Sequence, residues 1–363
     1  MGQPIQTRLK VLFTNEDKDI SEYLAADLLA FTYDDKETNE ADELTLTLKD
    51  PTGKWAGSWT PKGGERITAS ILNGNIYKQQ KELYCGRFYV DTLTASGSPR
   101  IFEIKAVSVP LNTPIRKKIK SKAWEKTNLK AIATAIASDN KIKLLYDANE
   151  NPAFDRQDQQ RESDLRFIGR LCEEAGLSLK VTNGQLVIFD QSYYESKKPV
   201  KTLTLGKSDI LTWTFEQAQS ETYKSVKVTY RNPKAKKKDS AGGYKIDSHG
   251  RLEKKSKNPA VMEYVYTDPD ADENGQEYAL KKRATSINDA KRLAKAKLRQ
   301  LNLRAVTGEI TVIGDVSLVA GVVIAIKGFG SFDGNFYIET ASHQVGTGGY
   351  TTALSIRRVN NKY

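Results

Sequence analysis

Histidine and cysteine are scarce in this chain, with two of each among 363 residues. A zinc site usually needs three or four ligands at close spacing, and no such cluster surrounds His249 or His343. Two cysteines, Cys85 and Cys172, cannot form a disulfide framework, so we expect the chain to be made and folded in a reducing cytoplasm. The sequence therefore predicts neither a metal site nor a disulfide-stapled fold.

Long apolar segments are also missing. No run approaches the roughly 20 apolar residues that a membrane-spanning helix needs. Residues 1–13 lack the extended apolar core of a secretory signal, so we expect no leader peptide. The sequence thus predicts no membrane span.

The motifs of catalysis and phosphate binding are incomplete. No Gly-x-Ser-x-Gly elbow is present. The glycine-rich residues 328–334 lie between two expected strands and carry Asp333 where a dinucleotide loop needs its last Gly, which predicts a hairpin turn. Residues 268–274 alternate Asp as a calcium loop does, but Ala279 stands where the loop needs its final Glu. We expect no catalytic, cofactor-binding or metal-binding residue, and no enzyme activity.

The net charge of the chain does not identify one class of binding partner. The net charge is +11, which is compatible with a nucleic acid, an acidic membrane or an acidic protein surface. Lys234 and residues 236–238 form a cluster without interleaved aromatic residues. This pattern favours a solvated loop over a nucleic-acid patch, because bases stack on aromatic side chains.

Residues 1–110 carry the pattern of β-strands. Apolar and polar residues alternate over 44–48 and 67–71, and further strands are expected over 88–90 and 101–107. Many short strands with Gly, Pro and Asn turns predict an N-terminal β-barrel domain.

A helix followed by a hairpin is predicted over residues 159–190. Ser163 can cap the helix, and Gly176 can end it in the left-handed conformation. Asn183-Gly184 is a strong signal for a two-residue hairpin turn. The expected apolar helix face is Leu165, Ile168, Leu171, Cys172 and Ala175.

An earlier helix is expected to begin after a Thr127 cap. Its predicted apolar face is Leu129, Ile132, Ala133, Ile136 and Ala137. Together with the helix–hairpin unit, it predicts an α+β middle domain over residues 111–198.

Residues 199–363 return to strands and predict a C-terminal β-barrel domain. Strands are expected over 213–215 and 225–230, and a polar, Lys-rich insertion over about 232–285. That insertion is expected to be mostly loop, with short strands over 244–246 and 261–266. A helix capped by Ser286 follows, with the expected face Ile287, Ala290, Ala294, Leu298 and Leu301. Four final strands are expected over 310–313, 322–326, 336–340 and 352–356.

An internal repeat links the two β domains. Residues 86–92 (Gly-Arg-Phe-Tyr-Val-Asp-Thr) match residues 334–340 (Gly-Asn-Phe-Tyr-Ile-Glu-Thr) at all but the second position, allowing conservative changes. Upstream, residues 64–67 resemble residues 321–324. The alternative is ordinary strand composition, but the pattern favours duplication. The expected fold is therefore mainly β, with two similar β-barrel domains plus a helix–hairpin domain.

The helix–hairpin unit resembles the phage late control gene D protein family. The resemblance rests on Glu-Ser-Asp-Leu-x-Phe-Ile-x-x-Leu-x-x-x-x-Gly over residues 162–176, followed by the Asn-Gly turn. Val316 departs from the family, which often has Pro there, and puts only that turn in doubt. Further matching positions are Phe31-Thr32-Tyr33-Asp34-Asp35, Ala41-Asp42-Glu43-Leu44, Trp55, Trp59, Pro61, Gly64, Gly314-Asp315, Gly321, Ile324, residues 332–338, His343 and Arg357.

The resemblance implies a structural baseplate hub protein of a contractile tail or tail-like injection particle. Such a hub is a homotrimer that joins the six-fold tail tube to the three-fold central spike. Its implied partners are the spike protein, tail tube or tube-initiator proteins and other baseplate proteins, with nucleic acid present only as DNA passing through the tube. The chain would assemble in the bacterial host cytoplasm and then reside in the particle's baseplate.

Two other functions stay open at this point. A cell-wall-binding or cell-wall-degrading tail-associated protein is the alternative from the same setting, although no catalytic constellation accompanies it. A nucleic-acid binder rests on charge alone, and would show a steeply salt-dependent affinity.

Overall fold

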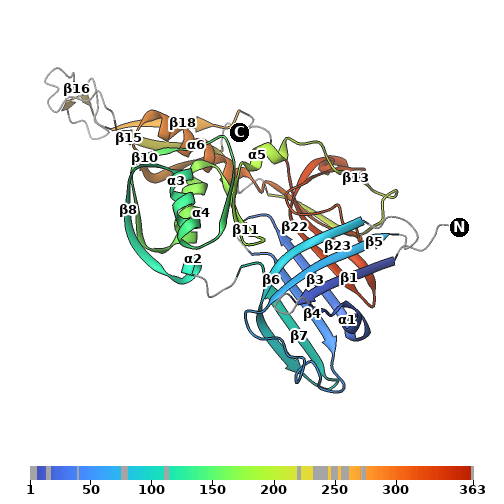
Figure 1. Cartoon of the computed structure of the whole chain (residues 1–363). Helices are drawn as coiled ribbons and strands as arrows, with labels where there is room; N and C mark the ends of the chain where they lie inside the picture. Colours follow the sequence, from blue (N-terminus) through green and yellow to red (C-terminus); the bar gives the residue numbers. More distant parts are fainter. Residues whose placement is uncertain are drawn as a thin grey trace. The chain divides into compact units, whose positions relative to one another are not determined.

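The computed structural model describes residues 6–13, 18–38, 41–74, 81–109, 114–218, 222–231, 244–246, 252–254, 261–269, 271 and 275–360 (Figure 1). The described chain is mainly β, as the sequence predicts. It divides into two compact units, one of which is formed mainly by Ala218–Ala305. None of the described helices is long and apolar enough to cross a membrane.

A single 13-stranded sheet organises the first unit. Its hydrogen-bonded order is β14-β20-β23-β22-β3-β4-β7-β6-β5-β1-β2, with β21 beside β22 and β13 beside β21. The strands from the N-terminal part are β1 (Gln6–Phe13), β2 (Lys18–Asp19), β3 (Leu28–Lys36), β4 (Glu43–Lys49), β5 (Arg66–Gly74), β6 (Lys81–Ser96) and β7 (Ile101–Val107). The strands from the C-terminal part are β13 (Lys201–Thr204), β14 (Ile210–Gln217), β20 (Val306–Ile313), β21 (Val323–Lys327), β22 (Gly334–Gly346) and β23 (Gly349–Arg358).

The internal repeat is visible in the strand registers. The order β3-β4-β7-β6-β5 corresponds to β14-β20-β23-β22-β21. Ile67 pairs with Phe88 and Ile324 pairs with Phe336, the positions that the sequence alignment matches. The pairing of β6 with β7 shifts after Val90, and that of β22 with β23 shifts after Ile338.

The starting strands of the two repeats share a shift as well. It falls after Leu28 in the β3–β4 pair and after Ile210 in the β14–β20 pair. The connection from β3 to β4 takes six residues, 37–42, whereas β14 and β20 are separated by residues 218–305. The duplication hypothesis therefore gains support from every strand of the repeat.

Period-two alternation builds the core of each repeat. In β4 the leucines at 44, 46 and 48 are fully buried, and the same face continues through Ile104 of β7 and Phe88 of β6. In the second repeat Ile310, Leu354 and Phe336 occupy the corresponding core. Trp55, next to the short helix α1 (Ser21–Asp27), is buried and donates to Asp27 at 2.9 Å.

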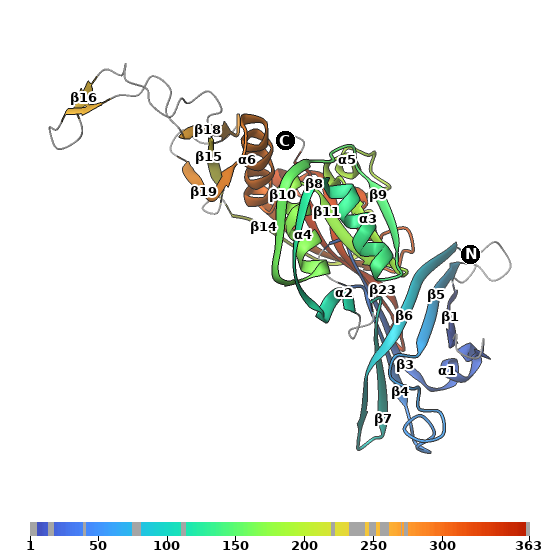
Figure 2. The same cartoon turned by 60° about the vertical axis from the view of Figure 1, so that its left-hand side comes forward.

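The middle segment combines helices with small sheets. In Figures 1 and 2 the helices α3 and α4 lie side by side, next to the paired strands β8 and β10. Strand β12 pairs antiparallel with β11 and parallel with β9. The bounds are α2 (Pro114–Lys117), β8 (Ile119–Asn128), α3 (Leu129–Asp139), β9 (Lys143–Asp147), β10 (Ala153–Ser163), α4 (Asp164–Ala175), β11 (Ser178–Thr182), β12 (Gln185–Phe189) and α5 (Gln191–Glu195).

One helix cap of this segment differs from the prediction. Asn128, not Thr127, caps α3 by accepting from the Ala131 amide at 2.8 Å, because the helix begins one residue later than predicted, at Leu129. The predicted apolar face of α3 is buried throughout.

Helix α4 and the hairpin after it follow the prediction closely. Ser163 accepts from the Arg166 amide at 3.3 Å. Ile168, Leu171 and Cys172 are buried, while Leu165 is only partly so. Asn183 and Gly184 both have positive φ and join β11 to β12 in the expected two-residue turn.

The second unit packs one helix on a three-stranded sheet. Strand β15 (Tyr223–Arg231) lies between β18 (Val261–Thr267) and β19 (Gln276–Ala284), and α6 (Ile287–Asn302) covers them. A separate pair is β16 (Tyr244–Ile246) with β17 (Leu252–Lys254). Strand β19 was not predicted, because its Lys and Arg side chains hide the alternation of apolar and polar residues.

The predicted cap of α6 is confirmed, and the prediction for one position of its apolar face is wrong. Ser286 accepts from the Asp289 amide at 3.2 Å. Ala290, Ala294 and Leu298 are buried, but Ile287 is exposed at the first turn, before the helix meets the sheet.

Several predictions from the sequence are not tested by the described residues. Lys234, residues 236–238 and His249 lie outside the described residues. The three-domain division at residues 110 and 198, the insertion over 232–285 and the count of barrels stay predictions.

Candidate functional site

The residues that could carry chemistry are dispersed. Within the described part of the chain, no group of three or more His, Cys, Asp or Glu residues could hold a metal ion. Cys85 and Cys172 are free and buried, and burial raises the pKa of the Cys85 thiol. Cys172 packs on the apolar face of α4, as the sequence predicts for a small hydrophobic residue.

His343 is a core residue. His343 lies inside β22 and is fully buried. Its Nδ1 is 2.8 Å from the Tyr350 hydroxyl, and its ring stacks on Tyr33 with centroids 5.9 Å apart. Burial lowers its pKa to about 4, so the ring stays neutral near pH 7.

The glycine-rich loop is a hairpin connection, and only part of the aspartate-rich loop lies within the described residues. Residues 328–333 join antiparallel β21 and β22 through a short 3₁₀ turn (Gly330–Phe332), as expected for a hairpin connection. Asp333 closes it by accepting from the Gly328 and Phe329 amides at 3.1 and 2.7 Å. In the aspartate-rich loop, Asp268 is buried and its carboxylate lies 3.5 Å from the Asn302 amide nitrogen.

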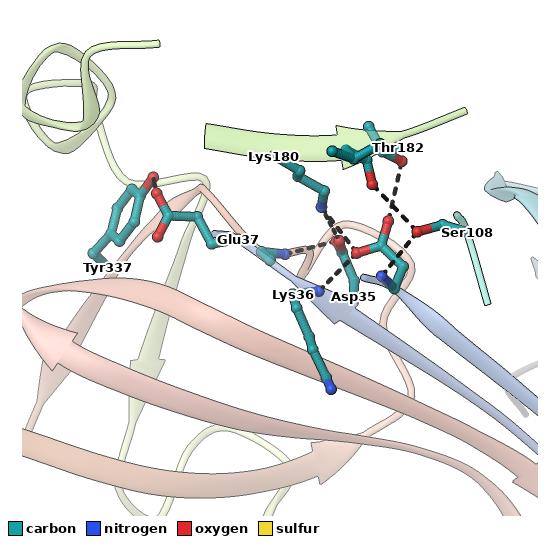
Figure 3. A network of polar contacts seen from close by, with 10 residues as sticks. Asp35, Lys36, Glu37, Ser108, Lys180, Thr182 and Tyr337 are labelled. Atoms are coloured by element: carbon teal, nitrogen blue, oxygen red, sulfur yellow. Dashed lines mark hydrogen bonds and ion pairs between the residues drawn. The ribbon is translucent and has the colours of Figure 1, made fainter. Parts of the chain in front are cut away.

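The most concentrated polar chemistry lies at the end of β3. Figure 3 shows Lys180 pointing from β11 toward Asp35. The Lys180 ammonium lies 2.7 Å from Asp35 and 3.2 Å from Asp42. Burial raises the pKa of Asp42. Burial also opposes the charge on Lys180, but the two carboxylates outweigh it and raise its pKa.

Backbone and hydroxyl groups complete this ion cluster. The Lys36 amide donates to Asp42 at 3.0 Å, and the Ala320 amide donates to Asp35 at 2.9 Å. Thr182 also donates to Asp42 at 3.0 Å (Figure 3). Both carboxylates are therefore satisfied by partners from distant parts of the chain, as buried charges require.

A second buried group extends from the loop after β3. Gln191 of α5 donates to both oxygens of Glu37 at 2.9 and 2.7 Å, and the Tyr337 hydroxyl donates at 2.7 Å. Burial raises the pKa of Glu37 to about 7. Burial and the neighbouring Glu37 also raise the pKa of the Tyr337 hydroxyl.

Arg357 closes the group from the last strand. Its side chain is fully buried, pairs with Glu195 of α5, and its Nε lies 3.3 Å from Glu339. The guanidinium also lies over the Tyr337 ring, 4.8 Å from its centroid. We call the whole set the polar junction: Asp35, Glu37, Asp42, Lys180, Gln191, Glu195, Tyr337 and Arg357.

The polar junction fixes the middle segment to the sheet. Lys180 comes from β11, and Gln191 and Glu195 come from α5. Among their partners, Asp35 and Arg357 lie on strands β3 and β23 of the 13-stranded sheet, and Glu37 and Asp42 lie in the loop that joins β3 to β4. The hairpin tip adds a further tie, since the Asn183 side chain accepts from the Arg87 amide at 3.0 Å. Gly86 permits this approach, because a Cβ there would lie 2.9 Å from the Asn183 oxygen.

Sequence reasoning did not find the polar junction. One signal was available: Phe31, Tyr33 and Asp35 share the buried face of β3 by period-two alternation. A carboxylate that continues an apolar face needs a buried partner, but the sequence does not say that Lys180 supplies it.

Comparisons with known proteins identify the family of the chain. The family model described as phage tail baseplate hub (GPD) matches residues 106–349. The probable baseplate hub protein of Escherichia phage 186 is 26% identical over 367 residues, covering 95% of this chain and 92% of that protein.

Solved structures share the fold. A tail protein from Neisseria meningitidis MC58 has a TM-score of 0.67 at 13% identity, covering 98% of this chain and 99% of that one. The E. coli c3393 protein, a component of the type VI secretion system with structural similarity to T4 tail proteins gp27 and gp5, has a TM-score of 0.55 at 11% identity. That match covers 99% of this chain and 78% of that one.

Proposed function

Because this chain belongs to the phage tail baseplate hub (GPD) family, we propose that it is a homotrimeric hub of a contractile tail or tail-like injection particle. In this role it joins the six-fold tail tube to the three-fold central spike. Its work is assembly, and its binding free energy lies in protein–protein interfaces rather than in a pocket. The chain catalyses no reaction.

The repeat of five strands carries this proposal. Each chain contributes two repeats with matching registers, β3 to β7 and β14 with β20 to β23. Three chains around a three-fold axis then present six similar repeats in a ring. Such a ring meets a six-fold tube with six near-equivalent surfaces, while the non-repeated parts of the chain keep three-fold symmetry toward the spike.

The polar junction is consistent with a subunit that transmits force, because it fixes the orientation of the middle segment. Ion pairs buried between the middle segment and the sheet are costly to break, because separation leaves charges unpaired. A subunit that transmits force between tube and spike requires such fixed orientation. The partners in this account are the spike protein, tube or tube-initiator proteins and other baseplate proteins, with assembly in the host cytoplasm before residence in the baseplate.

The native mass of the purified protein tests the trimer. Light scattering after size exclusion is expected to give three times the chain mass of 40.5 kDa, either for the chain alone or on co-expression with its spike. A species that remains one or two chains under both conditions would contradict the proposal.

A further inference from the structure

Two strand edges of the large sheet have no partner within the described residues. Strand β14 is the terminal strand of the sheet order and pairs with β20 alone. In β6, residues 81–89 pair with β5, but residues 92–96 pair only with β7 and leave the opposite edge open.

The repeat shows what covers the corresponding edges inside the chain. Strand β3 corresponds to β14, and β22 corresponds to β6. Within one chain β3 pairs antiparallel with β22, on the part of β22 that follows its β21 contact. Ser342 lies opposite Asp34, and Val345 lies opposite Phe31.

We propose that residues 92–96 of β6 in one copy pair antiparallel with β14 of a neighbouring copy, in the register that β22 and β3 use within the chain. Matching positions place Thr94 opposite Glu216, Ala95 opposite Phe215, and Ser96 opposite Thr214. Each copy uses both edges, so the contact is head-to-tail and closes into a ring. The number of copies, three, rests on the function proposed above.

Side-chain exposure on β14 fits this pairing. Trp213 is 47% exposed and Leu211 is 53% exposed. The position that corresponds to Trp213 in the first repeat is Phe31, which is fully buried next to β22. A neighbouring copy would cover Trp213 as β22 covers Phe31.

The composition of both edges also fits a partnered state. Neither β14 nor residues 92–96 contains Lys or Pro, the residues that commonly protect open edges. Glu216 is the single charge among them and faces Thr94, so no like charges oppose each other in the proposed register. Ala95 opposite Phe215 places a small side chain against a large one.

Disulfide trapping between copies tests this register. One population carries Thr94→Cys and the other carries Glu216→Cys, both at exposed positions. Directly opposed residues have Cβ atoms about 5 Å apart, close to what a disulfide needs. After mild oxidation of the mixed, reassembled protein, we expect about half of the chains to form a linked pair on a non-reducing gel, because a head-to-tail trimer that contains both variants has one matched contact. A second combination, Leu93→Cys with Gln217→Cys, samples the other class of cross-strand pair.

Three controls make the result specific. Thr94→Cys mixed with Thr212→Cys is displaced by four residues, roughly 13 Å along the strand, and is expected to link at least tenfold less. Asp34→Cys with Ser342→Cys in one chain should form an internal bridge, because these positions are opposed in the structure. Each single variant alone reports background from the native buried Cys85 and Cys172.

The outcomes separate this inference from the proposed function. A trimer whose matched pairs link supports both. A trimer that forms no matched link, while the internal bridge forms, overturns the edge pairing and leaves the hub intact. Links within the single variants would mean symmetric edge contacts and would also overturn it, as would a protein that is monomeric and unlinked.

Discussion

Individual buried charges fix the middle segment to the 13-stranded sheet. Lys180 is mostly buried between Asp35 and Asp42, and each carboxylate also accepts from a backbone amide. Breaking a buried ion pair costs more than the pair contributes, because the remaining charge loses both its partner and its water. The polar junction is therefore sensitive to loss of any one member.

Replacing Lys180 by Met is expected to lower the free energy of unfolding by about 3 kcal/mol. Without the ammonium, the buried carboxylates of Asp35 and Asp42 face each other. The pKa of Asp42, which burial already raises, then rises further above its ordinary value in the unfolded chain, because Lys180 no longer lowers it. The folded state then binds more protons than the unfolded state, so the deficit grows as pH rises from about 4 toward 7. Urea unfolding at pH 5 and pH 8 measures this.

A surface pair is the matched control for that change. Lys105 lies on strand β7, which pairs with β4. Its ammonium is 3.1 Å from Glu43, and its side chain is 42% exposed. Lys105→Met is expected to cost less than about 1 kcal/mol at either pH. An equal loss in both variants would show that Lys180 acts as an ordinary surface charge.

At the scale of helices and strands, local sequence patterns predicted the elements better than they predicted the contacts between them. The helix–hairpin unit was found because caps, helical spacing and an Asn-Gly turn agree over a short stretch. Strand β7 was predicted over the residues it occupies, and β19 was missed because its charged side chains conceal alternation. Contacts across more than a hundred residues, such as Lys180 with Asp35, leave no local pattern, so the polar junction was not predictable.

Substitution of Leu171 by Asp tests the buried face of α4. Leu171 is fully buried, and an unpaired carboxylate there is expected to unfold the middle segment. Arg166→Asp, on the exposed side of the same helix, is expected to change stability by no more than about 0.5 kcal/mol. Circular dichroism and limited proteolysis of both variants give the comparison. A soluble, fully folded Leu171→Asp protein would contradict this helix face.

For the whole molecule, duplication explains why one chain carries two sets of the same five strands. The matching shifts after Val90 and Ile338, and after Leu28 and Ile210, place the two sets in equivalent registers. The sequence revealed this through a seven-residue match, but the edge contact of β3 with β22 required the structure. That contact is the one that we propose to recur between neighbouring chains.

In the proposed assembly, three copies of the chain present six similar repeats. A cryo-electron microscopy reconstruction of the assembled protein, alone or with its spike, measures how these repeats are arranged. We expect successive repeats to be related by rotations of about 60° around the three-fold axis, with β14 of each copy beside β6 of the next. Repeats separated by unequal rotations, or an assembly without a three-fold axis, would contradict the account.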